Sequence, residues 1–184
     1  SDWGDVDNDG DLDLVVTGAT SSGSNTNIYR NDGDIDADGA VEFGRLGMSS
    51  IVSGSDVDIV GASAEFGDVN GDGALDLLVT GEDESTGDPK TRIYVNENAG
   101  TIAFSTLTTP VRQDSTKDGD AAFGDFSGDG RLDVASVGDS TTFDDPNESQ
   151  SAIFRNEGGS PPSFTKSNVA ITPVDSASVA WGDY

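Results

Sequence analysis

The sequence predicts an all-β fold built from repeated units of four antiparallel strands. Three observations support this prediction. An acidic nine-residue loop occurs three times within 184 residues. Short apolar runs bounded by glycine flank each copy, and no segment between the copies has the periodicity of an amphipathic helix. Self-similarity at a fixed period is typical of a repeat architecture, and the length suits one ordinary domain.

An aromatic-Gly-Asp step opens each acidic loop and marks the period of the repeat. Its four copies lie roughly 60 residues apart and are Trp3-Gly4-Asp5, Phe66-Gly67-Asp68, Phe123-Gly124-Asp125 and Trp181-Gly182-Asp183. The fourth copy ends the sequence after the residue that would be its first ligand.

Each repeat contains four short runs that predict β-strands. The first run precedes the loop, at 62–66, 121–123 and 178–181, and the second follows it, at 12–16, 75–79 and 132–137. A third run ends in a turn-forming Asn, at 28–31, 93–96 and 153–156. A fourth run is marked by Phe43, Phe104 and Phe164. Four antiparallel strands repeated radially form the blades of a β-propeller.

We therefore expect one propeller segment over residues 1–184, with repeats at approximately 1–61, 62–120 and 121–177 and an extra first strand at 178–184. Three blades are fewer than the four to eight that usually close a ring. Two alternatives stay open at this point: a partial ring belonging to a longer propeller, or a ring completed by oligomerisation of this chain. Arbitrary chain boundaries are a third reading of the same pattern.

The acidic loops predict cation sites, because calcium binds six to eight oxygen atoms and glycine permits the sharp turn that lets alternate residues face one centre. Oxygen-bearing side chains occupy loop positions 1, 3, 5 and 9, glycine occupies position 6, and position 7 would contribute its backbone carbonyl. The candidate ligands are Asp5, Asp7, Asp9, Asp11 and Asp13; Asp68, Asn70, Asp72, Ala74 and Asp76; and Asp125, Ser127, Asp129, Arg131 and Asp133. We expect about three Ca²⁺ ions per chain. The third loop should bind more weakly than the first, because Ser127 is a neutral ligand and the first loop has four candidate carboxylates.

Other readings of these loops are less favourable. An EF-hand requires a Glu at position 12 and flanking helices, whereas position 12 here is Val16, Val79 or Ser136. Magnesium is disfavoured because it demands near-octahedral geometry and retains its waters. Acidic turns without an ion are the remaining alternative.

A fourth candidate site has the same spacing and consists of Asp34, Asp36, Asp38 and Glu42. The other two repeats have no counterpart to it. The alternative interpretation is a solvated acidic hairpin.

Composition limits the possible partners. The formal charge is −26, from 35 acidic and 9 basic residues, and such a surface repels nucleic acid and anionic lipid. The chain has no Cys and no His, so disulfides, thiolate chemistry and the commonest general base are excluded. No apolar run is long enough to insert into a membrane. The acidity fits either a high-salt habitat or a secreted calcium protein.

The motif resembles the FG-GAP repeats of the integrin α-subunit propeller and their bacterial VCBS-type relatives. The resemblance rests on Phe/Trp-Gly followed by Asp-x-Asn/Asp-x-Asp-Gly-x-x-Asp, then Leu-x-Leu-Val and Thr-Gly, and it covers essentially the whole chain. It implies a β-propeller with calcium in the hairpin between the first two strands of a blade, and an extracellular role in adhesion or ligand binding. The Gly-Ala-Pro part of the pattern is degenerate, since Gly18-Ala19 lacks the Pro.

The sequence leads to three hypotheses for function. The first is a calcium-stabilised, non-catalytic module that is extracellular, secreted or on the cell surface and recognises a protein or glycan. The second is the propeller part of a polysaccharide-active enzyme, since paired carboxylates can act as acid and base. The third is a purely architectural repeat that assembles with itself or with the remainder of a longer propeller. We expect packing roles for Trp3, Trp181 and Tyr184.

Overall fold

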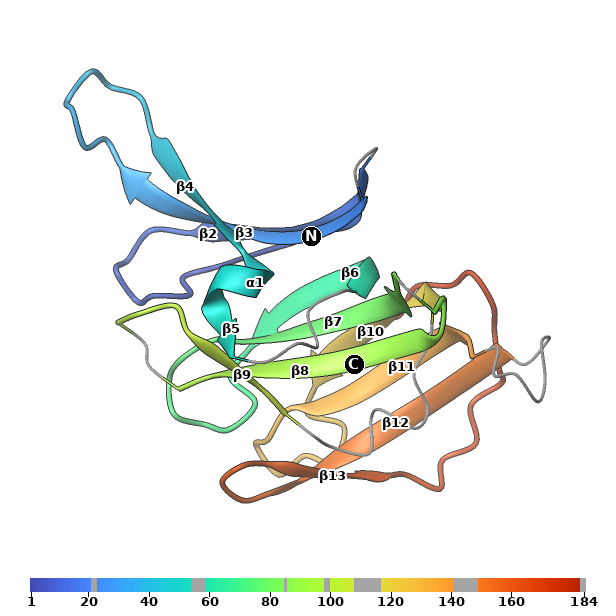
Figure 1. Cartoon of the computed structure of the whole chain (residues 1–184). Coiled ribbons are helices and arrows are strands. Elements are labelled where there is room, and N and C mark those ends of the chain that lie inside the picture. Colours follow the sequence, from blue (N-terminus) through green and yellow to red (C-terminus); the bar gives the residue numbers. More distant parts are fainter. Residues whose placement is uncertain are drawn as a thin grey trace.

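A computed structural model describes residues 1–20, 23–53, 59–84, 86–97, 100–107, 117–140 and 149–182. Within these residues the chain forms three stacked β-sheets and one short helix (Figure 1). We call the sheets the first, middle and third blade, in chain order. Asp183 and Tyr184, which belong to the predicted extra strand and the predicted packing residues, lie outside the described residues.

The first and third blades are four-stranded antiparallel meanders, as predicted. The first blade has the order β1-β2-β3-β4, with β1 at Asp2–Gly4, β2 at Asp13–Thr20, β3 at Gly23–Gly33 and β4 at Glu42–Gly47. The third blade has the order β10-β11-β12-β13, with β10 at Lys117–Gly124, β11 at Asp133–Asp139, β12 at Ser149–Gly158 and β13 at Ser163–Lys166.

The middle blade has five strands rather than the predicted four. Its order is β5-β9-β8-β7-β6, with β6 at Ile59–Gly67, β7 at Asp76–Asp83, β8 at Pro89–Asn96 and β9 at Phe104–Thr106. The added strand β5 (Val52–Ser53) pairs in parallel with β9 and follows helix α1 (Met48–Ile51). Met48 and Val52 are both buried in the core, so burial of apolar surface holds this connection against the middle blade.

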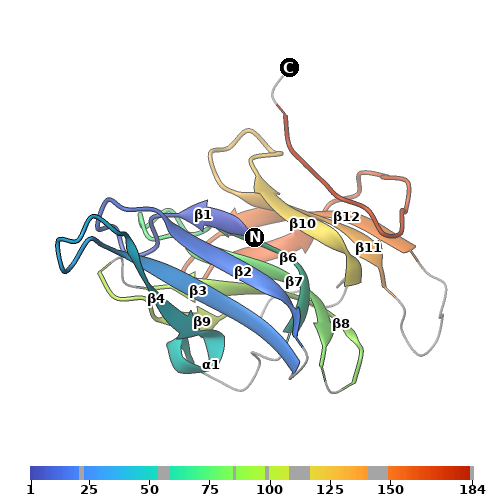
Figure 2. The same cartoon turned by 90° about the horizontal axis from the view of Figure 1, so that it is seen from above.

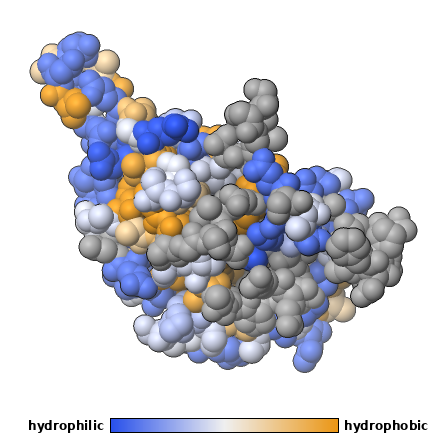
Figure 3. All heavy atoms as spheres, viewed as in Figure 1, coloured by the Kyte–Doolittle hydropathy of each residue, from blue (hydrophilic) through white to orange (hydrophobic). Residues whose placement is uncertain are grey.

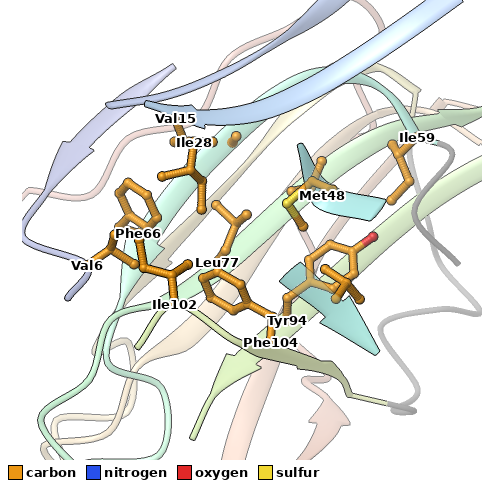
Figure 4. Close-up of a cluster of buried hydrophobic side chains, with 13 residues drawn as sticks. Val6, Val15, Ile28, Met48, Ile59, Phe66, Leu77, Tyr94, Ile102 and Phe104 are labelled. Atoms are coloured by element: carbon orange, nitrogen blue, oxygen red, sulfur yellow. The ribbon is translucent and has the colours of Figure 1, made fainter. Parts of the chain in front are cut away.

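Alternating side chains of the middle blade fill two hydrophobic cores. Leu77 and Val79 of β7 face the first blade, whereas Leu78 faces the third. Figure 4 shows part of the first core, in which Val15 and Ile28 of the first blade face Leu77. Because strand side chains alternate between faces, a strand buried on both sides reads as a continuous apolar run. This explains the compact apolar run at residues 75–79.

The predicted extra first strand does not form a β-strand in residues 178–182. The segment nevertheless lies beside β10, where the backbone N–H of Val179 donates to the Asp120 carboxylate at 3.1 Å and the indole N–H of Trp181 donates to the carbonyl of Ala122 at 3.2 Å. Figure 2 shows it running past β10 toward the C-terminus. No described strand pairs with its backbone, so it has no ladder of hydrogen bonds.

The three stacked meanders are blades of a β-propeller-type fold. Consecutive blades pack face to face, with each inner strand against the next: β1 contacts β6, and β6 contacts β10. Among the described residues, no helix has the length and apolar character needed to cross a membrane.

Candidate metal centres

The three acidic loops connect the first and second strands of their blades and share one backbone conformation. Position 6 has φ of 98° at Gly10, 89° at Gly73 and 85° at Gly130. Position 4 is also left-handed, with φ of 57° at Asn8, 76° at Gly71 and 70° at Gly128. Asn and Gly are the residues that adopt this region most readily. The sequence therefore forms the same turn three times.

The carboxylate at position 1 organises each loop by accepting backbone N–H groups from positions 5 and 6. Asp5 accepts from Asp9 and Gly10, each at 3.0 Å. The equivalent bonds of Asp68 are 3.1 and 2.9 Å, and those of Asp125 are 3.0 and 2.8 Å. Position 5 in turn accepts the N–H of position 7, in pairs that join Asp9 to Asp11, Asp72 to Ala74 and Asp129 to Arg131.

The carboxylate at position 9 joins the loop to the third strand. Asp13, Asp76 and Asp133 are fully buried. One oxygen of each accepts the backbone N–H of Asn31, Asn96 or Asn156 at 2.8 Å, and the other accepts an N–H from within the loop. That loop donor is Val6 or Val69 at position 2, but Ser127 at position 3 in the third loop.

The first loop brings three predicted ligands together. Oxygen atoms of Asp5, Asp7 and Asp13 all lie within 4.8 Å of one another. Oδ1 of Asp7 is buried and has no hydrogen-bond partner among the described residues. A buried oxygen without a donor is costly unless something else satisfies it, and a cation at the centre of the loop would do so.

Burial raises the pKa of several loop carboxyl groups, so it disfavours their ionised form in the absence of a cation. It raises the pKa of Asp7, where the neighbouring Asp9 charge adds to the effect, and it raises the pKa of Asp13. In the second loop, burial raises the pKa of Asp76 to about 7 against the hydrogen bonds from Asn96 and Val69. A bound cation reverses this tendency, because its charge stabilises the ionised form.

The remaining predicted ligands differ between loops. In the first loop, Asp9 and Asp11 are exposed at its rim. In the second, the amide nitrogen of Asn70 donates to Asp72 at 2.8 Å, while its Oδ1 accepts the N–H of Asp72. In the third, the guanidinium groups of Arg131 and Arg155 both contact Asp129. The third loop thus already neutralises part of its own charge.

The fourth candidate loop repeats the turn but not its buried anchor. Asp34 accepts the N–H groups of Asp38 and Gly39 at 3.1 and 2.9 Å, and carboxylate oxygens of Asp34, Asp36 and Asp38 lie within 4.8 Å of one another. All three are exposed. The loop forms the mainly hydrophilic tip of the β3–β4 hairpin at the upper left of Figure 3. Glu42, at position 9, lies at the start of β4.

Two asparagines that connect adjacent blades were not predicted from the sequence. The amide of Asn96 donates to the carbonyl of Val6 at 3.1 Å, and that of Asn156 donates to the carbonyl of Val69 at 2.8 Å. Each Asn therefore joins its blade to the acidic loop of the preceding blade. The sequence pattern by itself predicts only turns at these positions. Their signal was the recurrence of Asn at the same place after Ile-Tyr or Ile-Phe in every repeat.

Comparison with known proteins bears on the same segments. A sequence model described as an FG-GAP-like repeat matches residues 5–79 and again residues 68–136. Each match begins at the first Asp of one acidic loop and extends through the next loop into the strand that follows it. A search of curated proteins found no significant match. Since the matched residues span more than half of the chain, the protein belongs to the family of FG-GAP-like repeat proteins.

Proposed function

We propose that this chain is a calcium-binding β-propeller module in which the ions are structural and which recognises an extracellular protein or glycan without catalysis. The observation that carries the calcium part is the first loop, where Asp5, Asp7 and Asp13 converge and Oδ1 of Asp7 is buried without a donor among the described residues. This arrangement offers a cation several oxygen ligands at one point.

The ligand chemistry favours calcium over other metals. The three loops offer carboxylate, amide, hydroxyl and carbonyl oxygens, and the chain has neither His nor Cys. Hard cations prefer oxygen ligands, and calcium tolerates irregular mixtures of them, whereas magnesium requires near-octahedral geometry. The proposal includes a secreted or cell-surface location, which the resemblance to FG-GAP repeats implies.

A structural role follows from the connections of each loop. Asp76 accepts the N–H of Asn96 on β8, and Asn96 reaches the preceding loop at Val6. An ion that holds Asp76 ionised and in place would therefore reinforce both its own blade and the stacking of blades. Because binding to the folded state alone stabilises that state, calcium should raise the melting temperature.

Calcium titration by calorimetry, paired with thermal unfolding in calcium and in chelator, tests this proposal. We expect about three ions per chain and a substantial fall in melting temperature on chelation. Asp7→Ala should abolish one site. The matched control is Asp88→Ala, an exposed Asp outside the loops, which should leave the stoichiometry unchanged. Identical melting curves with and without calcium would refute the structural role.

The number of ions bound per chain also tests whether the loop at Asp34 is a fourth calcium site. A fourth ion that disappears in Asp34→Asn would assign this loop as a site. Three ions in both proteins would show that this loop binds no calcium.

Several carboxylates outside the loops have structural partners, which supports a non-catalytic role. Asp2, Glu65 and Asp120 line the groove where the inner strands meet. They accept the backbone N–H groups of Phe66, Phe123 and Val179, respectively. We expect binding without turnover in a polysaccharide panel. Turnover that survives chelation and purification would favour the polysaccharide-active alternative.

A further inference from the structure

A side chain of the first acidic loop makes a direct hydrogen bond to the second acidic loop. The amide nitrogen of Asn8 donates to the carbonyl of Gly73 at 2.9 Å, although the two residues lie 65 positions apart in the chain. Asn8 occupies position 4 of the first loop, and Gly73 occupies position 6 of the second. Two of the proposed calcium loops are therefore in contact with each other.

This hydrogen bond fixes a peptide group that lies between two predicted ligands of the second loop. The carbonyl of Gly73 and the N–H of Ala74 belong to one peptide group, and this N–H donates to Oδ1 of Asp72 at 2.8 Å. Because the peptide group is planar, a donor that fixes its carbonyl also fixes the direction of its N–H. The neighbours of Gly73 are Asp72, the predicted ligand at position 5, and Ala74, whose carbonyl is the predicted ligand at position 7.

The position of the Asn8 amide depends in turn on the conformation of the first loop. Asn8 lies between the predicted ligands Asp7 and Asp9 and has a left-handed backbone, with φ of 57°. The N–H of Asp9 donates to Asp5 at 3.0 Å. The turn that gathers the ligands of the first loop therefore also determines where the Asn8 side chain reaches.

A second hydrogen bond connects the same two loops in the opposite direction. Asp76, which closes the second loop, accepts the backbone N–H of Asn96 at 2.8 Å, and the Asn96 amide donates to the carbonyl of Val6 at 3.1 Å. Val6 lies between the predicted ligands Asp5 and Asp7. Each loop is thus connected to a peptide group that lies among the predicted ligands of the other.

Within the described residues, the junction between the second and third loops repeats only one of these two links. The amide of Asn156 donates to the carbonyl of Val69 at 2.8 Å, which is the counterpart of the Asn96 bond. Position 4 of the second loop, however, is Gly71, which has no side chain to reach the third loop. Its φ of 76° is left-handed, like that of Asn8. The two junctions therefore differ in the residue type at position 4 and not in the fold of the turn.

We propose that Asn8 couples calcium binding at the first and second loops, so that occupation of either loop raises the affinity of the other. This inference rests on the proposed function, because it requires both loops to bind the ion. Ordering a loop costs conformational entropy. A loop that its neighbour already holds in the binding conformation loses less entropy when it binds. By thermodynamic linkage the coupling is the same in both directions. Asn8 is a positioning residue in this scheme and not a ligand.

The expected size of the coupling is roughly twofold to tenfold in affinity, which is the range that the net strength of one hydrogen bond allows. Repulsion between ions in neighbouring loops acts in the opposite direction and is screened by salt. Because Asn and Gly are both neutral, this repulsion is the same in Asn8→Gly as in the unaltered protein. The difference between these two proteins therefore measures the coupling that the side chain transmits. Glycine also accepts the left-handed backbone of this position.

Calcium titration of the full chain by NMR tests the proposal loop by loop. The N–H groups of Gly10, Gly73 and Gly130 each donate to the position 1 carboxylate of their own loop, so their signals report each site separately. Inactivating the first loop with Asp7→Ala should lower the affinity of the second loop roughly twofold to tenfold. In the Asn8→Gly background, the same Asp7→Ala change should leave the affinity of the second loop nearly unchanged.

This double-mutant cycle distinguishes coupling from a merely structural role. If Asn8 only stabilised the second loop, Asn8→Gly would lower the affinity of that loop equally with and without a functional first loop. The matched control is Asn168→Gly, an exposed Asn outside the loops, which should preserve the response to Asp7→Ala. Spectra of the calcium-free proteins check that every variant folds.

Hydrogen exchange in chelator gives a readout that does not depend on calcium. Asn8→Gly should speed exchange of the Ala74 N–H, because the carbonyl of the same peptide group loses its donor. An unchanged exchange rate would overturn the proposal, as would an equal effect of Asp7→Ala on the second loop with and without Asn8→Gly. In the latter case all three loops would still bind calcium, and the proposed function would stand. Loops that bind no calcium in the unaltered protein would overturn both proposals.

Discussion

The carboxylate of Asp76 accepts the backbone N–H of Asn96 at 2.8 Å, and both residues are completely buried. The side chain of the same Asn96 donates to the carbonyl of Val6 in the preceding blade at 3.1 Å. Two consecutive hydrogen bonds therefore connect one acidic loop, through a strand of its own blade, to the acidic loop of its neighbour. The proposed ion site and the stacking of blades thus share one set of residues.

Removing the Asn96 amide should weaken the stacking of blades. Asn96→Ala leaves the buried carbonyl of Val6 without this donor, at a cost of about 1–3 kcal/mol in the free energy of unfolding. The matched control is Asn31→Ala, because the Asn31 amide bonds within its own blade, to the exposed carbonyl of Leu12 at 3.3 Å. Chemical denaturation at low protein concentration measures both. Equal losses for the two variants would contradict this account.

The close packing around Gly67 predicts a difference in stability between two glycine-to-alanine variants. Gly67→Ala places a methyl group 2.7 Å from the ring of Phe123 and 2.9 Å from Leu132, and overpacking of this kind costs about 1–3 kcal/mol. Gly18→Ala has open space around its Cβ and should be neutral or stabilise by roughly 0.5–1 kcal/mol, because it restricts the unfolded chain. Thermal unfolding with saturating calcium compares them. A Gly67→Ala protein as stable as Gly18→Ala would disprove close packing at this junction.

Without calcium, the protein should become less stable as pH rises from about 4 to 8. The folded pKa of Asp76 is about 7, above its unfolded value of 3.8, so the folded state retains a proton that the unfolded state releases. The resulting stabilisation is complete below the unfolded pKa and is lost as pH rises through the folded one. Asp7, Asp13 and Glu65 have pKa values raised by burial and act in the same direction.

Denaturation of the chelated protein across this pH range measures the slope, which reaches at most about 1.4 kcal/mol per pH unit for one group. Asp76→Asn should reduce the slope, because it removes the carboxyl group whose pKa burial raises to about 7. Saturating calcium should flatten or reverse the slope, since the ion requires ionised ligands. Stability that increases with pH in the absence of calcium would contradict the expected sign.

The third loop should bind calcium most weakly. Its position 3 is the neutral Ser127, and two guanidinium groups contact Asp129. Affinity rises with the number of charged ligands, so Ser127→Asp should strengthen this site by roughly tenfold. The reciprocal change, Asp7→Ser, should weaken the first site. Calcium calorimetry on both variants checks the ranking, and unchanged constants in both would mean that position 3 is not a ligand.

Much of the fold follows from local sequence. Gly10, Gly73 and Gly130 occupy the left-handed position of their turns, and the apolar runs after them form the predicted second strands. These features depend on residues that are close in the chain, such as Asp5 and the N–H groups of Asp9 and Gly10. Local conformational preference and side-chain alternation are sufficient to predict them.

Other features depend on residues far apart in the chain. The parallel strand β5 forms because Val52 and Met48 pack into a core made by side chains of other strands. The predicted strand at 178–184 has no ladder of hydrogen bonds over its described residues, 178–182, because pairing requires a second strand, which the described residues do not place beside it. The stacking role of Asn96 arises from an acceptor 90 residues away. No local pattern specifies such partners.

By itself, the sequence determined the blade repeat, the spacing of the oxygen ligands and the glycine turns, because each of these is encoded within a few neighbouring residues. Only the tertiary structure decided which carboxylates are buried and which Asn side chains join adjacent blades. Those properties depend on long-range contacts, since burial and hydrogen-bond satisfaction are settled when separate blades pack together.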